Sequence, residues 1–122
     1  MPHPVVHIEL KVSDAEKSRA WYEKVFGWQT EFMPEMNYST FSFGKEGYPV
    51  GGGLNGDADA PSGTIAYFAT DSVATSLAKA KAEGAEVVVD VSPIPNMGMF
   101  AIFKDPDGNM LGLFSTEGAN GA

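Results

Sequence analysis

Residues 5–27 read VVHIELKVSDAEKSRAWYEKVFG, and this stretch decides the fold. Apolar and polar residues alternate strictly over residues 6–12, which is typical of a strand with one apolar and one polar face. The polar face carries His7, Glu9 and Lys11. We therefore expect an amphipathic strand whose polar side is available for chemistry.

A helix is predicted to follow directly, over residues 14–26. Ser13 and Glu16 fit a capping box, Asp14 favours the positive end of the helix, and Gly27 stands where a C′ glycine belongs. Four bulky residues at helical spacing are predicted to be core: Trp21, Tyr22, Val25 and Phe26.

Three short strands and a linker complete the first half. The strands are expected at 28–33, 38–43 and 48–54, and the polar, glycine-rich linker at 56–63. The second half repeats this order. A strand is predicted at 64–69, then a helix capped by Asp71 or Ser72 and ended by Gly84, with a buried stripe of Val73, Leu77 and Ala80. Further strands are predicted at 86–91, 99–103 and 110–114.

The two halves match at a single offset of 57 positions. The matching pairs are His7 with Thr64, Asp14 with Asp71, and Gly27 with Gly84. The pattern predicts an α+β fold of two tandem βαβββ modules. We expect a single domain over 1–122, with module one at 1–55, the linker at 56–63, module two at 64–115 and a tail at 116–122.

The composition of the chain excludes several kinds of functional site and classes of partner. The chain has 122 residues, 43% of them apolar, and no cysteine, which excludes a disulfide framework, a thiolate metal site and a cysteine nucleophile. A net charge of −8 argues against nucleic acid and anionic membranes as partners. No basic and apolar leader and no run of 18 apolar residues is present, so a cytoplasmic protein is expected.

Three stretches resemble the vicinal oxygen chelate superfamily, the group of glyoxalase I, bleomycin-resistance proteins and extradiol dioxygenases. They are HIELKVSD at 7–14, WYEKVFGW at 21–28 and FKDPDGN at 103–109. The resemblance implies that the two modules curl into an open, incomplete barrel, with helices outside and the ligand in the concavity. It also implies that the protein forms a homodimer.

Catalytic members of that superfamily hold a divalent metal with four side chains. The resemblance places these four positions at His7, Gly53, Thr64 and Gly112, of which only His7 is a metal-ligand type. A set built from His3, His7 and Glu9 would need the N-terminal tail to fold back, with Asp57 and Asp59 as further candidates from the linker. We therefore predict no metal and no cofactor, as in a bacterial glyoxalase-like branch that this chain resembles.

A ligand site is expected in the concavity, where alternation and the resemblance place polar, aromatic and glycine residues. The candidate ligand-binding residues are His7, Glu9, Tyr38, Thr40, Gly53, Thr64, Phe68, Met110, Gly112 and Phe114. Glycines at 51–53 and Gly112 are interpreted as widening the pocket. Residues 92–98 are either a lid or a plain connection between strands, and residues 105–108, DPDG, are a turn.

Three functions stay open. The first is metal-independent binding of a largely apolar small molecule by a homodimer, with sequestration of a toxic compound as one version. The second is an enzyme of lyase or isomerase type in which His7 and Glu9 are the catalytic acid and base. The third is a non-catalytic module for self-association or regulation, whose sheet faces form a dimer core.

Overall fold

A computed structural model describes residues 3–43, 50–61 and 63–117. The chain divides into two compact units, one of Val6–Ile65 and one of Ala66–Ala122 together with Met1–Val5. The N-terminal segment joins the second unit through the backbone, because Ala69 N–H donates to the carbonyl oxygen of Pro4 at 2.9 Å.

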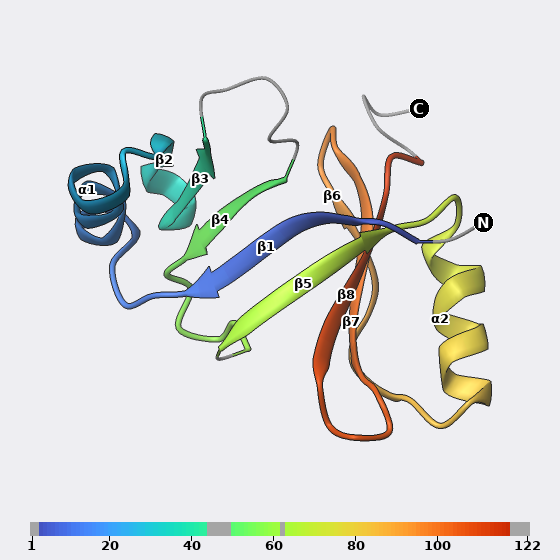
Figure 1. The fold of residues 1–122 in the computed structure, drawn as a ribbon. Coiled ribbons are helices and arrows are strands. Elements are labelled where there is room, and N and C mark those ends of the chain that lie inside the picture. The colour runs from blue at the N-terminus through green and yellow to red at the C-terminus, as the bar shows by residue number, and fades with distance from the viewer. Residues whose placement is uncertain (1–2, 44–49, 62, 118–122) are drawn as a thin grey trace. The chain divides into compact units, whose positions relative to one another are not determined.

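Module one is a four-stranded mixed sheet covered by one helix (Figure 1). Its elements are β1 (Val5–Lys11), α1 (Ala15–Phe26), β2 (Gln29–Met33), a 3₁₀ turn (Pro34–Met36), β3 (Tyr38–Ser42) and β4 (Gly51–Asn55). Strand β1 runs parallel to β4, which is antiparallel to β3, which is antiparallel to β2. The strand predicted at 48–54 overlaps β4 at residues 51–54, and its first two residues lie outside the described part of the chain.

Module two repeats this topology. Its elements are β5 (Thr64–Ala69), α2 (Val73–Ala82), β6 (Glu86–Ile94), β7 (Gly98–Lys104) and β8 (Met110–Ser115). Strand β5 runs parallel to β8, and β8, β7 and β6 are successively antiparallel. The predicted fold class, α+β with two tandem βαβββ modules, is confirmed.

The helix ends follow local chemistry. Asp14 is the N-cap of α1, since its Oδ1 accepts from Lys17 N–H at 3.1 Å, so the cap is Asp14 and not the predicted Ser13. Gly27 ends α1 in the left-handed region at φ 70°, as expected for a C′ glycine. Ser72, one of the two predicted caps, accepts from Thr75 N–H and begins α2.

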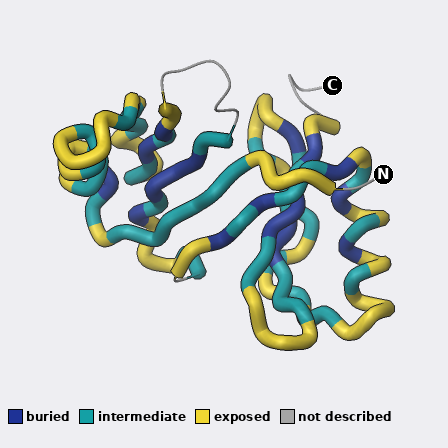
Figure 2. The backbone as a smooth tube through the Cα atoms, viewed as in Figure 1, coloured by how far each residue is buried: buried dark blue, intermediate teal, exposed yellow. Residues whose placement is uncertain are grey.

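The core of module one lies on the face of the sheet that α1 covers. Phe41 and Leu54 are buried there, whereas Trp21 and Phe26 on α1 are 54% and 59% exposed. Figure 2 shows that most of α1 has the colours of exposed and intermediate residues. The prediction that the bulky residues of this helix are core is therefore wrong for Trp21, Val25 and Phe26. The ring of Trp21 instead contacts the rings of Tyr22 and Phe26 edge-on.

The core of module two lies between α2 and the sheet. Val73 and Leu77 of α2 are buried against Ala101 of β7 and Leu113 of β8. This part of the predicted stripe is confirmed, and Phe68 of β5 packs against the same cluster.

Two predicted connections are now defined. Residues 92–98 form the end of β6 and a tight hairpin turn, in which Ile94 pairs with Gly98, so this segment is the plain connection and not a lid. The turn at residues 105–108 is confirmed, because Gly108 N–H donates to Asp105 O at 2.9 Å and the Asp105 carboxylate accepts from Asn109 N–H at 2.8 Å. Within the described residues, no helix is long and apolar enough to cross a membrane.

Candidate functional site

The sheet of module one has a second face, opposite α1, that is polar. Strand register places Glu9 of β1 beside Gly53 of β4, and Tyr38 of β3 beside Asn55 of β4. His7 shares this face because it lies two residues before Glu9 on the same strand. We call the face that carries His7, Glu9, Tyr38 and Asn55 the polar face of module one.

A chain of hydrogen bonds joins these four side chains. The Tyr38 hydroxyl donates to Glu9 Oε2 at 3.1 Å and lies 3.2 Å from His7 Nε2. The hydroxyl has one proton and gives it to Glu9. Its oxygen therefore accepts from His7 in the tautomer of the ring that carries the hydrogen on Nε2. Asn55 Nδ2 donates to the other carboxylate oxygen, Oε1 of Glu9, at 3.3 Å. Tyr38 thus bridges an imidazole and a carboxylate.

Glycine makes this bridge possible. Tyr38 is on β3 and His7 and Glu9 are on β1, and β4 lies between these two strands. A Cβ atom on Gly53 would lie 1.7 Å from the Tyr38 hydroxyl oxygen, so only a glycine lets the ring cross β4. The prediction that Gly53 widens a pocket is wrong, because the Tyr38 ring occupies the space beside it.

Burial shifts the pKa values of His7 and Glu9 in opposite directions. Desolvation lowers the pKa of His7, and it raises the pKa of Glu9 against the opposing effect of the hydrogen bonds from Asn55 and Tyr38. The two pKa values therefore approach each other, which lowers the free-energy cost of moving a proton between the imidazole and the carboxylate. Neutral imidazole is the favoured form of His7 at pH 7.

Two more residues of module one lie on the polar face or contact the linker. Thr40 pairs with Gly53 on the polar face and lines a pocket of about 360 Å³ with Gln29, Glu31 and Ser42. Lys11, at the other end of β1, donates from Nζ to the carbonyl oxygen of Ala60 at 3.0 Å, in the linker.

In module two the predicted residues divide between the two faces of the sheet. Met110, Gly112 and Phe114 alternate along β8 on the face away from α2, where Tyr67 pairs with Gly112. Phe68 pairs instead with Leu113 and packs in the α2 core. The prediction that Phe68 shares a ligand-facing surface with Met110 and Phe114 is therefore wrong.

Two further predicted positions also differ from expectation. Thr64 lies two residues before Ala66 and four before Phe68 on β5, so it shares the α2 side of the sheet and is exposed at the strand start. Over Gly112 lies the ring of Tyr67, whose Cδ2 would be 2.4 Å from an added Cβ atom. Gly112, like Gly53, accommodates a tyrosine and does not open a pocket.

Sequence reasoning missed Tyr67 and Asn55. Asn55 is the last residue of β4 and lies outside the strand predicted at 48–54, although an amide at a strand end beside a carboxylate is a common hydrogen-bond partner. Tyr67 alternates with its neighbours along β5 and lies opposite Gly112 of β8. This pairing could not be predicted, because it depends on the register of two strands whose paired residues are 45 positions apart.

A metal of the kind that the resemblance implies does not fit the residues present. Tyrosine rings occupy the space beside Gly53 and Gly112, and His7 and Glu9 are the two ligand-type side chains of the polar face. Over the described ranges, no three His, Cys, Asp or Glu side chains form a group that could hold a metal ion. Asp57 and Asp59 bond to each other in the linker, where Asp59 N–H donates to Asp57 Oδ1 at 3.0 Å.

The chain is similar to known proteins in both sequence and structure. A family profile described as the Glyoxalase/Bleomycin resistance protein/Dioxygenase superfamily matches residues 5–113. The protein named "Putative glyoxylase CFP32" in Mycobacterium bovis is 32% identical over 104 residues, which cover 82% of this chain and 39% of that protein, and its namesake in Mycobacterium tuberculosis matches equally. The chain therefore spans about two fifths of the length of these curated relatives.

Solved structures share the fold at low sequence identity. A protein described as an NAD-dependent benzaldehyde dehydrogenase from Legionella pneumophila aligns with a TM-score of 0.70 at 16% identity, covering 94% of this chain and 99% of that one. A glyoxalase/bleomycin resistance protein/dioxygenase superfamily member from Vibrio splendidus 12B01 aligns with a TM-score of 0.64 at 16% identity, covering 93% and 98%. At such identities the likeness concerns the fold alone.

Proposed function

The chain belongs to the glyoxalase/bleomycin resistance protein/dioxygenase superfamily, and on that premise we propose that it binds a small molecule at the polar face of module one without a metal ion. The observation that carries the proposal is the hydrogen-bonded chain of His7, Tyr38, Glu9 and Asn55. In the functional form we propose, the chain is a homodimer and the ligand is otherwise apolar, as a sequestered toxic compound would be.

The chemistry of the polar face favours a ligand with a hydroxyl or carbonyl group. Asn55 offers an amide donor, Glu9 offers acceptor oxygens, and the Tyr38 hydroxyl can exchange its hydrogen bond to Glu9 for one to the ligand. These groups are partly withdrawn from water, where a hydrogen bond to a ligand discriminates strongly against analogues that cannot form it.

The two histidines of the chain allow a direct test, since the sequence contains only His3 and His7. We would label histidine with ¹³C and screen small hydroxy and carbonyl compounds by NMR, following both ring signals. The proposal predicts compounds that shift the His7 signals in a saturable way and leave His3 in place. A library in which no compound moves His7 would contradict it.

A matched pair of variants adds specificity to the screen. Tyr38→Phe should weaken binding of each compound found, whereas Tyr22→Phe, which removes a hydroxyl from the α1 surface, should leave affinity unchanged.

A native mass spectrum of the untreated protein reports the dimer and any bound metal together. One metal ion per chain would overturn the metal-free proposal.

A second candidate function, acid–base catalysis, is favoured by the Tyr38 bridge between His7 and Glu9. In this alternative His7 removes a proton from a carbon next to a carbonyl group, the electron pair of the C–H bond forms an enolate, and Glu9 orients the imidazole through Tyr38. Exchange of that C–H for deuterium in D₂O measures the step. His7→Ala should abolish exchange while affinity changes by no more than a few fold, and no exchange in any bound compound would leave binding as the function.

A further inference from the structure

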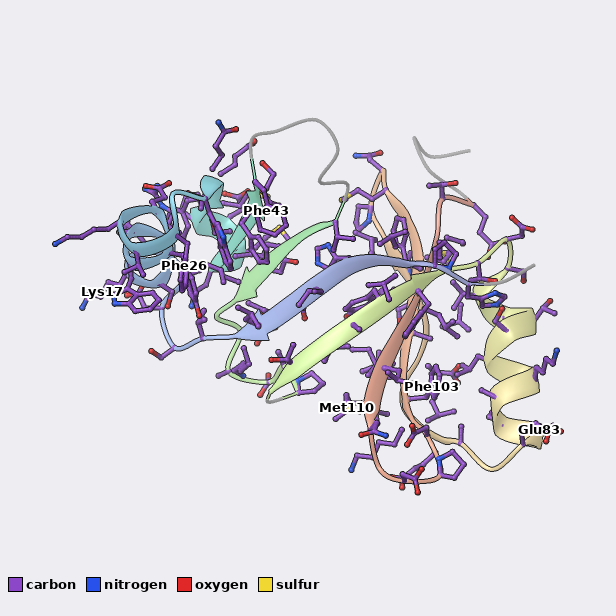
Figure 3. All side chains as sticks on the ribbon, viewed as in Figure 1. Lys17, Phe26, Phe43, Glu83, Phe103 and Met110 are labelled. Atoms are coloured by element: carbon purple, nitrogen blue, oxygen red, sulfur yellow. The ribbon has the colours of Figure 1, made fainter. Side chains whose placement is uncertain are left out.

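A groove runs along α2 on the side of module two opposite to Tyr67 and Gly112. It has a volume of about 580 Å³, and its lining is mostly apolar, with Phe103 and Leu113 from the strands and Ala80 from the helix. Figure 3 shows Phe103 in the region between the strands and α2. Volumes of this order are typical of sites for small organic ligands.

The sequence explains why the groove is open. The stripe of α2 that faces the strands carries the buried side chains of Val73 and Leu77 and then the half-buried Ala80, so a methyl group stands where a third large side chain would cover the strands. Leu77 and Val73 are buried, whereas Ala80 leaves the Phe103 ring accessible to the groove. The gap is therefore a consequence of one small residue in the packing stripe.

Polar groups gather at one end of the groove. His3 Nε2 lies 3.1 Å from Ser76 Oγ, which lies 2.6 Å from Thr70 Oγ1. Lys79 follows Ser76 by three residues on the same helix face and also lines the groove. Among the described residues, no carboxylate lies within 4.0 Å of the Lys79 ammonium group. Glu83 lines the groove one turn further on, at the opposite end from Ser76.

We propose that this groove binds a small apolar carboxylate. Its ring or chain lies over Phe103 and Ala80, and its carboxylate lies between Ser76 and Lys79, away from Glu83. The position of Lys79 decides the class of ligand: it lines the groove one turn after the Ser76 hydroxyl, and no carboxylate of the described residues lies within 4.0 Å of its ammonium group. The groove shares no residue with the polar face of module one.

The test uses 2-naphthoate as the anionic probe and 2-naphthalenemethanol as its neutral counterpart of the same ring shape. The ¹³C-histidine and amide NMR signals of the intact chain are followed during each titration. We expect 2-naphthoate to shift His3 and amides of residues 75–80 in a saturable way, to leave His7 in place, and to bind about tenfold more tightly than the neutral probe.

Three variants locate the probe. Lys79→Gln should weaken 2-naphthoate about tenfold and leave the neutral probe unchanged, whereas Lys81→Gln removes a lysine of the same helix that does not line the groove and should change neither. Ala80→Leu should fill the gap and weaken both probes. The lysine pair gives the decision even if Ala80→Leu does not fold.

Three results would overturn the proposal. These are an equal effect of Lys79→Gln and Lys81→Gln, a titration that shifts His7 and not His3, and the absence of saturable shifts up to millimolar probe. Because the two histidines report separately, a failure here is distinguishable from a failure of binding at the polar face.

Discussion

The ring of Tyr38 lies across Gly53, where a Cβ atom would stand 1.7 Å from its hydroxyl oxygen. This contact carries a β3 side chain over β4 to the β1 residues His7 and Glu9. The hydrogen-bonded chain of the polar face thus depends on the absence of a side chain at one position.

Gly53→Ala should therefore destabilise the protein, by about 1–3 kcal/mol, because the methyl group and the Tyr38 ring cannot both occupy the space. The measurement is urea unfolding. In a Tyr38→Ala background the same glycine substitution should cost much less, since the ring is gone. Additive effects of the two substitutions would show that ring and glycine do not compete.

Tyr38→Phe should lower the free energy of unfolding by about 1–2 kcal/mol, because His7 Nε2 and Glu9 Oε2 lose a partner while partly buried. The matched control is Tyr22→Phe on α1, for which a change within about 0.5 kcal/mol is expected. Equal losses in the two variants would contradict a structural role of the Tyr38 hydroxyl.

Stability should depend on pH through His7 in a defined direction. Burial holds the pKa of His7 in the folded state below the ordinary value of 6.5, so the unfolded chain binds more protons in that range. The contribution of His7 is fully present above pH 6.5 and is lost as the pH falls toward the folded pKa. Glu9 acts oppositely, since its raised pKa makes folding less favourable as the pH rises above 4.5.

The His7 contribution is isolated by comparison with His7→Gln, in which Glu9 remains. Unfolding free energies at pH 7.5 and 5.5 should differ more for the wild-type protein than for the variant, with the wild type losing the additional stability at pH 5.5. A direct check is the NMR titration of the His7 ring, whose midpoint should lie below 6.5. A midpoint above that value would reverse the sign of the prediction.

Trp21→Ala should cost far less stability than Leu54→Ala, although tryptophan is the larger residue. Trp21 is 54% exposed on α1, whereas Leu54 is fully buried beneath that helix. We expect a loss of about 2–5 kcal/mol for Leu54→Ala and under about 1 kcal/mol for Trp21→Ala in chemical denaturation. A larger loss at Trp21 would restore the original expectation that this ring is core.

Much of the fold could be predicted from local patterns. Alternation predicted β1, Gly27 and the cap before Val73 predicted helix ends, and the offset of 57 positions revealed the two modules. Each of these signals is contained in a few neighbouring residues. The burial of α1 was predicted wrongly, because helical spacing identifies a stripe of large side chains but not whether the sheet beneath has room for them.

The candidate site, too, could be predicted only in part from the sequence. The amino-acid sequence by itself determined that His7 and Glu9 share one strand face and that the family's metal positions at Gly53 and Gly112 have no side chain to offer. Only the tertiary structure decided that Tyr38 bridges His7 and Glu9, that Tyr67 covers Gly112, and that Phe68 belongs to the α2 core. The physical reason is that neighbours across strands are set by sheet order and register, which join residues 29 or more positions apart and leave no periodic trace in either segment.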